Sequence, residues 1–139
     1  NIKVIDRMLT VDQMFDLYRM SDVFVYPSWG EGFGFNPLQA IGMGIPTICT
    51  SGWATYSKYI TMPLDSEVSL SPWPFTHPGY MLKPNREQLK HYMKEVVKDY
   101  DKYSQLAFKN SFIVHDIWDW KKVTEPAVKR LEKIYNSKL

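Results

Sequence analysis

Residues 23–49, VFVYPSWGEGFGFNPLQAIGMGIPTIC, contain the pattern that decides the fold. The first four residues, 23–26, are apolar strand formers, and such a run is typical of a buried strand in a parallel sheet. A glycine-rich loop follows at 28–34, and the apolar spacing after it predicts a short helix over 37–43. A second apolar strand is predicted at 47–49. Strand, helix and strand in this order indicate a right-handed crossover between parallel strands.

The ends of the short helix carry their own signals. Asn36 is predicted to cap its first turn, because an Asn side chain can accept a bond from a free helical N–H. Pro37 suits the first helical position, where no N–H is needed. Gly44 is predicted to end the helix, since glycine readily adopts the left-handed conformation found there.

The segment before this stretch extends the alternation. Residues 2–5 include three apolar residues that favour a short strand, with Val4 in the sheet. Thr10 and Gln13 form a predicted capping box, and apolar spacing up to residue 18 then indicates a helix. The sequence therefore predicts an α/β fold, a Rossmann-like parallel sheet flanked by helices.

The second half of the chain is predicted to be less regular and then helical. Residues 51–78 contain four of the nine prolines and are expected to wrap the edge of the sheet, with one further strand near 68–70. A last strand is predicted at 79–82. Asn85 and Gln88 form a second predicted capping box, and helices are expected over about 85–135.

Composition bounds the class of protein. The chain has 139 residues, enough for one domain, and a net charge of only +2, so no nucleic-acid partner is expected. No apolar run approaches the length of a transmembrane helix. The single cysteine, Cys49, and the lack of a signal-peptide pattern favour the cytoplasm, with peripheral membrane association left open. The three histidines share no metal-ligand spacing, so no metal is expected.

The glycine-rich loop is the candidate site. A loop after a parallel strand lies at the sheet edge where α/β proteins bind ligands, and the following helix directs free N–H groups toward it. Glu31 in this loop is an acceptor suited to the hydroxyl groups of a sugar. Gln39, two helical turns on, is placed to reach a second hydroxyl-bearing group such as a ribose. The plainer interpretation is a tight turn with an exposed Glu31.

The motifs SDVFVYPS, EGFG, LQA and GMGIP between residues 21 and 46 resemble the core of the family-4 retaining glycosyltransferases, which have the GT-B fold. Residues 79–85 and 118–123 resemble later segments of the same family. The resemblance implies that the chain is part of the carboxy-terminal, donor-binding domain, spanning 1–139, and that its substrate is a nucleotide-diphosphate sugar with no further cofactor.

The resemblance also implies roles for individual residues. Glu31 matches the glutamate that holds the donor sugar, and it is the implied catalytic residue. Gln39 stands where the family usually has a second glutamate that holds the ribose, so this position departs from the pattern. The implied donor- and nucleotide-binding residues are Gly32, Phe33, Gly34, Phe35, Asn36, Gln39, Arg7 and Met8.

Two further departures limit the expected function. The family's basic phosphate-binding loop and its amino-terminal domain have no counterpart in the chain. We therefore expect a glycosyltransferase when that domain is present, and no turnover by this chain alone. The acceptor is not identified by the sequence. Two alternatives stay open, a non-catalytic nucleotide-sugar-binding module and another GT-B enzyme such as a sugar-nucleotide epimerase.

Overall fold

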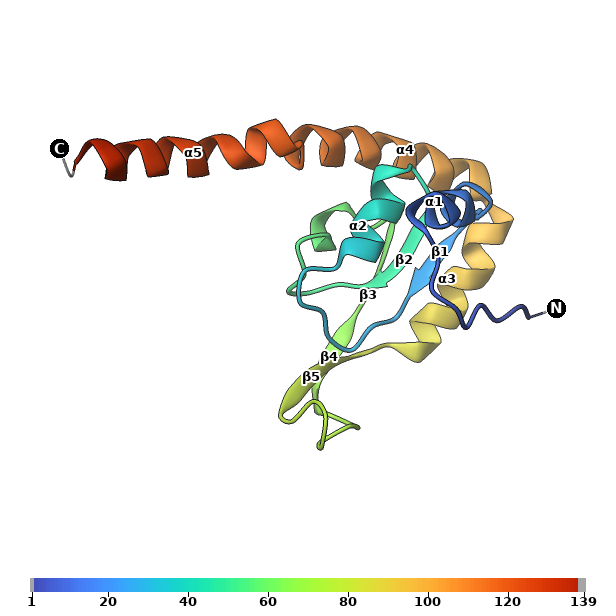
Figure 1. Ribbon diagram of the computed structural model, residues 1–139. Coiled ribbons are helices and arrows are strands. Elements are labelled where there is room, and N and C mark those ends of the chain that lie inside the picture. The colour runs from blue at the N-terminus through green and yellow to red at the C-terminus, as the bar shows by residue number, and fades with distance from the viewer. Residues whose placement is uncertain (1, 138–139) are drawn as a thin grey trace.

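A three-stranded parallel sheet forms the centre of the computed structural model, which describes residues 2–137 (Figure 1). The strands lie in the order β1 (Phe24–Tyr26), β2 (Thr47–Thr50) and β3 (Met62–Leu64). Tyr26 pairs with Cys49, and Thr50 pairs with Leu64, so all three strands end at the same edge of the sheet. The predicted α/β class and the parallel pairing of the two predicted strands are confirmed.

Helices cover both faces of the sheet. Helices α2 and α4 pack on one face beside Cys49, whereas α3 packs on the other beside Ile48. The helices are α1 (Val11–Arg19), α2 (Phe35–Gly42), α3 (Arg86–Lys98), α4 (Tyr100–Ile117) and α5 (Trp120–Asn136), with a single 3₁₀ turn, η1 (Ser57–Tyr59). The helices predicted over about 85–135 are therefore confirmed as three.

Strand β2 is the most buried element of the sheet. All four of its residues are buried, and neighbours point to opposite faces, so Ile48 and Cys49 enter different apolar clusters. Thr47 is also buried, but its polar groups are satisfied by Thr61: each residue donates its backbone N–H to the other's hydroxyl oxygen, at 3.2 and 3.1 Å. The N–H and hydroxyl of Thr47 are thus both paired, although the residue lies among apolar side chains.

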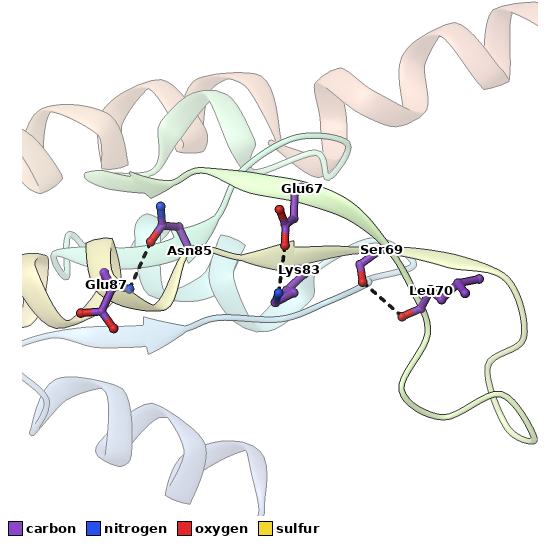
Figure 2. Close-up of polar contacts among 6 residues, drawn as sticks. All are labelled: Glu67, Ser69, Leu70, Lys83, Asn85 and Glu87. Atoms are coloured by element: carbon purple, nitrogen blue, oxygen red, sulfur yellow. Dashed lines mark hydrogen bonds and ion pairs between the residues drawn. The ribbon is translucent and has the colours of Figure 1, made fainter.

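A β-hairpin projects from the sheet edge where the parallel strands end (Figure 1). Strands β4 (Ser66–Leu70) and β5 (Tyr80–Pro84) pair antiparallel, and Ser66 follows β3 after one residue. Figure 2 shows an ion pair across the hairpin, with 2.9 Å between the Lys83 ammonium and the Glu67 carboxylate. The strand expected near 68–70 is therefore confirmed as β4, whereas β3 lies in a region predicted to be irregular.

The strand predicted at residues 2–5 is absent. Val4 does not join the sheet, and the segment lies exposed, running away from the body of the fold (Figure 1). A strand is stabilised by pairing with a neighbour, and the sheet contains no strand beside which residues 2–5 lie. The helix predicted next is confirmed as α1, and so is its Thr10–Gln13 capping box.

The predicted capping box at Asn85 is only half correct. The Asn85 side chain accepts from the N–H groups of Glu87 and Gln88 (Figure 2 shows the Glu87 bond). The Gln88 side chain, however, does not return to the cap. It bonds to Asp65 instead, accepting from its N–H at 2.6 Å, because the chain between β3 and β4 passes beside the start of α3.

Helix α5 extends beyond the rest of the fold (Figure 1). No residue of α5 is buried, and Trp120 and Leu131 are among its most exposed apolar side chains. Among residues 2–137, no helix is both long enough and apolar enough to cross a lipid bilayer.

The thiol of Cys49 provides a test of this packing. It is fully buried, and burial raises its pKa to about 12, so both access and thiolate formation are suppressed. We expect the native protein to react with a thiol reagent at pH 8 orders of magnitude more slowly than the chain unfolded in urea. Rapid labelling of the native protein, measured by absorbance, would place Cys49 outside the core.

Candidate functional site

The candidate site lies at the edge of the sheet where the parallel strands end. Strand β1 ends at Tyr26, and the glycine-rich loop 28–34 connects it to α2. The hairpin leaves the sheet at the same edge, and its Leu82 N–H donates to the carbonyl of Trp29 at 3.0 Å. In open α/β sheets this edge is where ligands bind.

Glu31 is held in this loop by two neutral hydroxyl groups. The Tyr26 hydroxyl donates to Glu31 Oε1 at 2.6 Å. The Ser28 hydroxyl lies 2.9 Å from the same oxygen and 2.7 Å from the carbonyl of Gly30, with one proton to donate between them. Both contacts to Glu31 use Oε1, so Oε2 takes no part in them. The arrangement fixes the carboxylate while leaving an acceptor oxygen for a ligand.

Tyr26 is suited to this role because it stays protonated. Burial, together with the hydrogen bond to Glu31 and the negative charge of that carboxylate, raises the pKa of Tyr26 to about 12. The hydroxyl is therefore a donor throughout the physiological pH range. Sequence reasoning missed Tyr26 and Ser28 as supports of Glu31, although both precede it by only a few residues.

The loop rests on the segment after β2. Trp53 Nε1 donates to the carbonyl of Glu31 at 3.1 Å, and the Thr55 hydroxyl donates to the carbonyl of Phe33 at 2.8 Å. These bonds connect residues 22 positions apart in the chain. They satisfy loop carbonyl groups that no regular secondary structure would satisfy.

Gly34, not Asn36, is the cap of α2. Gly34 adopts a left-handed conformation with φ of 84°, and the helix begins at Phe35, so Pro37 is its third residue. A Cβ atom on Gly34 would lie 2.3 Å from Cε1 of the buried Tyr56 ring. The close packing of the loop on Tyr56 forces the chain to turn at Gly34, two residues earlier than predicted. No side chain caps the helix, so its first N–H groups stay available to a ligand.

A pocket of about 350 Å³ borders the loop beside Trp53, and two larger hollows flank it. A cleft of about 790 Å³ lies between the loop and the hairpin. A groove of about 700 Å³ lies among α1, α2 and the junction of α4 with α5. The cleft is lined by Tyr26, Pro27, Ser28, Trp29, Gly30, Glu31, Gly32, Trp73, Thr76, His77 and Met81.

The residues implied by the resemblance divide between these hollows. Glu31 and Gly32 line the cleft, and the groove is lined by Phe35, Asn36 and Gln39. The Tyr18 hydroxyl lies 3.3 Å from the side-chain oxygen of Gln39 and 3.2 Å from the carbonyl of Asn36, with one proton to donate between them.

In the chain, Phe33 and Gly34 lie between the cleft residues Glu31 and Gly32 and the groove residues that begin at Phe35. The Phe33 ring packs against Phe35, with centroids 4.5 Å apart. Arg7 and Met8 are exposed and line neither hollow; the nearest groove residue in the chain is Leu9.

Among the described residues, 2–137, three polar side-chain atoms are buried without a hydrogen-bond partner: Thr50 Oγ1, Tyr56 Oη and Trp118 Nε1. Burial raises the pKa of the Tyr56 hydroxyl, so it stays neutral. Within residues 2–137, no group of three histidine, cysteine, aspartate or glutamate side chains is arranged to hold a metal ion.

The fold and this edge define an α/β protein with a candidate ligand site beyond the ends of its parallel strands. Residues 1–61 match the family described as Glycosyl transferases group 1. A segment of 59 residues is 41% identical to the lipopolysaccharide core biosynthesis mannosyltransferase LpsB of Rhizobium meliloti (strain 1021). That segment is 40% of this chain and 16% of the relative, so the chain spans a small part of the relative's length. The family match connects residues 1–61, with the glycine-rich loop, to glycosyltransferases, and this relative is a glycosyltransferase as well.

The packing of the loop on Tyr56 predicts a sharp difference between two glycines. Gly34→Ala places a methyl group against the Tyr56 ring at a left-handed position, whereas a Cβ on Gly32 would meet nothing within 4 Å. We expect Gly34→Ala to lower the free energy of unfolding by about 3 kcal/mol, and Gly32→Ala to change it by less than about 1 kcal/mol. Urea unfolding followed by circular dichroism measures both, and equal values would contradict the contact.

Proposed function

We propose that this chain is the donor-binding part of a retaining glycosyltransferase with the GT-B fold, acting on a nucleotide-diphosphate sugar. The observation that carries the proposal is the position of Glu31, a fixed carboxylate beside the uncapped start of α2. The match of residues 1–61 to group 1 glycosyltransferases supports it.

The carboxylate and the helix suit different parts of such a donor. An ionised carboxylate accepts hydrogen bonds and repels phosphate, so Glu31 serves the hydroxyl groups of the sugar. The free N–H groups and partial positive charge at the start of α2 favour an anion, so the diphosphate rests there with the backbone of residues 33–36.

The groove on the other side of the loop suits the nucleoside. Gln39 lies in it with a side-chain amide able to bond a ribose hydroxyl, and Leu9 offers an apolar wall for a base. Arg7 and Met8 border this region in the chain and contact the base only if the segment before α1 moves toward the groove.

The rest of the enzyme is proposed to come from an amino-terminal GT-B domain. Transfer requires the donor and an acceptor hydroxyl to be held together with water excluded, and a second domain closing over the donor site would supply both conditions. The substrate is the nucleotide sugar itself, with no separate cofactor, in a cytoplasmic enzyme. The amino-terminal domain supplies part of the acceptor site in this proposal. The chain alone is therefore expected to show no turnover.

Removal of the Glu31 charge tests the assignment. Glu31→Gln keeps the size of the side chain but weakens its hydrogen bonds to sugar hydroxyls, since charged acceptors bind more strongly than neutral ones. We expect nucleotide-sugar binding to this chain, measured by calorimetry with UDP-, GDP- and ADP-sugars, to weaken about tenfold for the sugar that the native chain prefers.

The matched control is Glu67→Gln on the hairpin, which is exposed and lines neither the cleft nor the groove. It should leave donor affinity within about twofold of native. Unchanged affinity in Glu31→Gln, or an equal loss in both variants, would reject Glu31 as the residue that holds the sugar.

The departure at position 39 gives a second test. Gln39→Glu retains the oxygen that accepts from Tyr18, so the fold should tolerate it. A charged acceptor should strengthen the ribose bond by about 1 kcal/mol, roughly fivefold in nucleotide affinity. A tenfold loss of nucleoside diphosphate affinity in calorimetry, with an unchanged melting temperature, would show that glutamine is required there.

A further inference from the structure

The hairpin side of the cleft carries features that the donor assignment does not use. Trp73, Thr76 and His77 line it from the tip of the hairpin, and Met81 lines it from β5. These residues lie outside the segment that matches group 1 glycosyltransferases. They face Glu31 and Trp29 across about 790 Å³ of space.

The hairpin tip is a rigid turn. The carbonyl of Trp73 accepts from the N–H groups of Thr76 and His77 at 3.1 and 2.8 Å, and the Trp73 N–H donates to the Ser71 hydroxyl at 3.0 Å. Three prolines at 72, 74 and 78 further restrict the backbone. Little conformational entropy is therefore lost when a ligand contacts Trp73.

Trp73 presents an open aromatic face. Its side chain is 51% exposed, and its ring meets Trp29 edge-to-face, with centroids 6.0 Å apart at 74°. Trp29 belongs to the glycine-rich loop and is bonded through its carbonyl to Leu82 of β5. The two tryptophans thus line the same cleft as Glu31, and about half of the surface of Trp73 stays open to a ligand.

The chemistry of the lining selects an uncharged ligand. None of the eleven described residues that line the cleft is a lysine or an arginine, so neither of these cations offers a phosphate a charged partner there. An indole face packs well on the C–H face of a pyranose ring, and hydroxyl and imidazole groups bond to hydroxyls at the ring edge. Trp73 supplies the face, and Thr76 and His77 supply the polar groups.

We propose that this side of the cleft is a subsite for a neutral pyranose ring, stacked on Trp73 beside Glu31. The inference rests on the proposed function, because it adds a sugar-binding surface to the same site. The ring belongs either to an acceptor saccharide or to the donor sugar, and both have the same chemistry. The volume of the cleft exceeds that of one sugar ring, so the subsite extends beyond the reach of Glu31.

The test uses the 139-residue chain labelled with 5-fluorotryptophan, whose five tryptophans give separate ¹⁹F resonances assigned by single replacements. Methyl α-mannoside, methyl α-glucoside and methyl β-galactoside are titrated to about 50 mM, the range of weak sugar binding. We expect at least one glycoside to shift the resonances of Trp73 and Trp29 and to leave that of Trp120 on α5 unchanged.

Variants in the same turn provide the control. Trp73→Ala should weaken glycoside binding at least about tenfold, as read from the Trp29 resonance. Phe75→Ala removes a fully exposed ring that does not line the cleft, and should change the affinity less than twofold. His77→Ala retains both tryptophans and should weaken binding about threefold. No glycoside shift at Trp73, or an equal loss in the Trp73 and Phe75 variants, would overturn the subsite.

Repeating the titration with UDP-glucose or GDP-mannose present distinguishes the two sources. Undiminished glycoside binding identifies an acceptor subsite, whereas competition identifies the subsite of the donor sugar. A failed Glu31→Gln prediction with intact glycoside binding would reject the donor assignment and leave the subsite standing. Intact donor binding with no glycoside response at Trp73 would reject the subsite and leave the donor assignment standing.

Discussion

The contact of Gly34 with the buried ring of Tyr56 sets the geometry on which the site depends. Because no Cβ atom fits there, the backbone of the loop lies directly on the ring and turns into α2 at a left-handed residue. The same segment after β2 also binds the carbonyls of Glu31 and Phe33 through Trp53 and Thr55. One short stretch of chain therefore positions both the carboxylate and the start of the helix.

Neutral partners keep Glu31 available to a ligand. The ion pairs among the described residues lie at exposed positions, as between Lys83 and Glu67, and no lysine or arginine among them pairs with Glu31. The carboxylate is instead held by hydroxyl groups, which orient it without neutralising its charge. A salt bridge at this position would fix the side chain equally well but would compete with the hydroxyl groups of a sugar.

The sequence predicted what local pattern can encode. The apolar run at 23–26, the capping box at Thr10 and the helices after residue 85 all followed from spacing and caps. The sequence did not predict β3, whose three residues lie in a proline-rich stretch, or the failure of residues 2–5 to form a strand, because both depend on which neighbours are present to pair with. The cleft escaped prediction for the same reason, since Trp73 reaches Glu31 only through the pairing of β4 with β5.

Helix α5 buries none of its 17 residues, so tertiary packing contributes little to holding it. An isolated helix of this length is marginal in water, and Pro126 in its second turn removes one of its backbone bonds. The helix is therefore a separate unit of stability. We expect it to open and close many times for each unfolding of the sheet, so that its amide protons exchange with solvent while those of β2 remain protected. Helix α5 and the parallel sheet thus differ not only in shape but in the lifetime of their folded states.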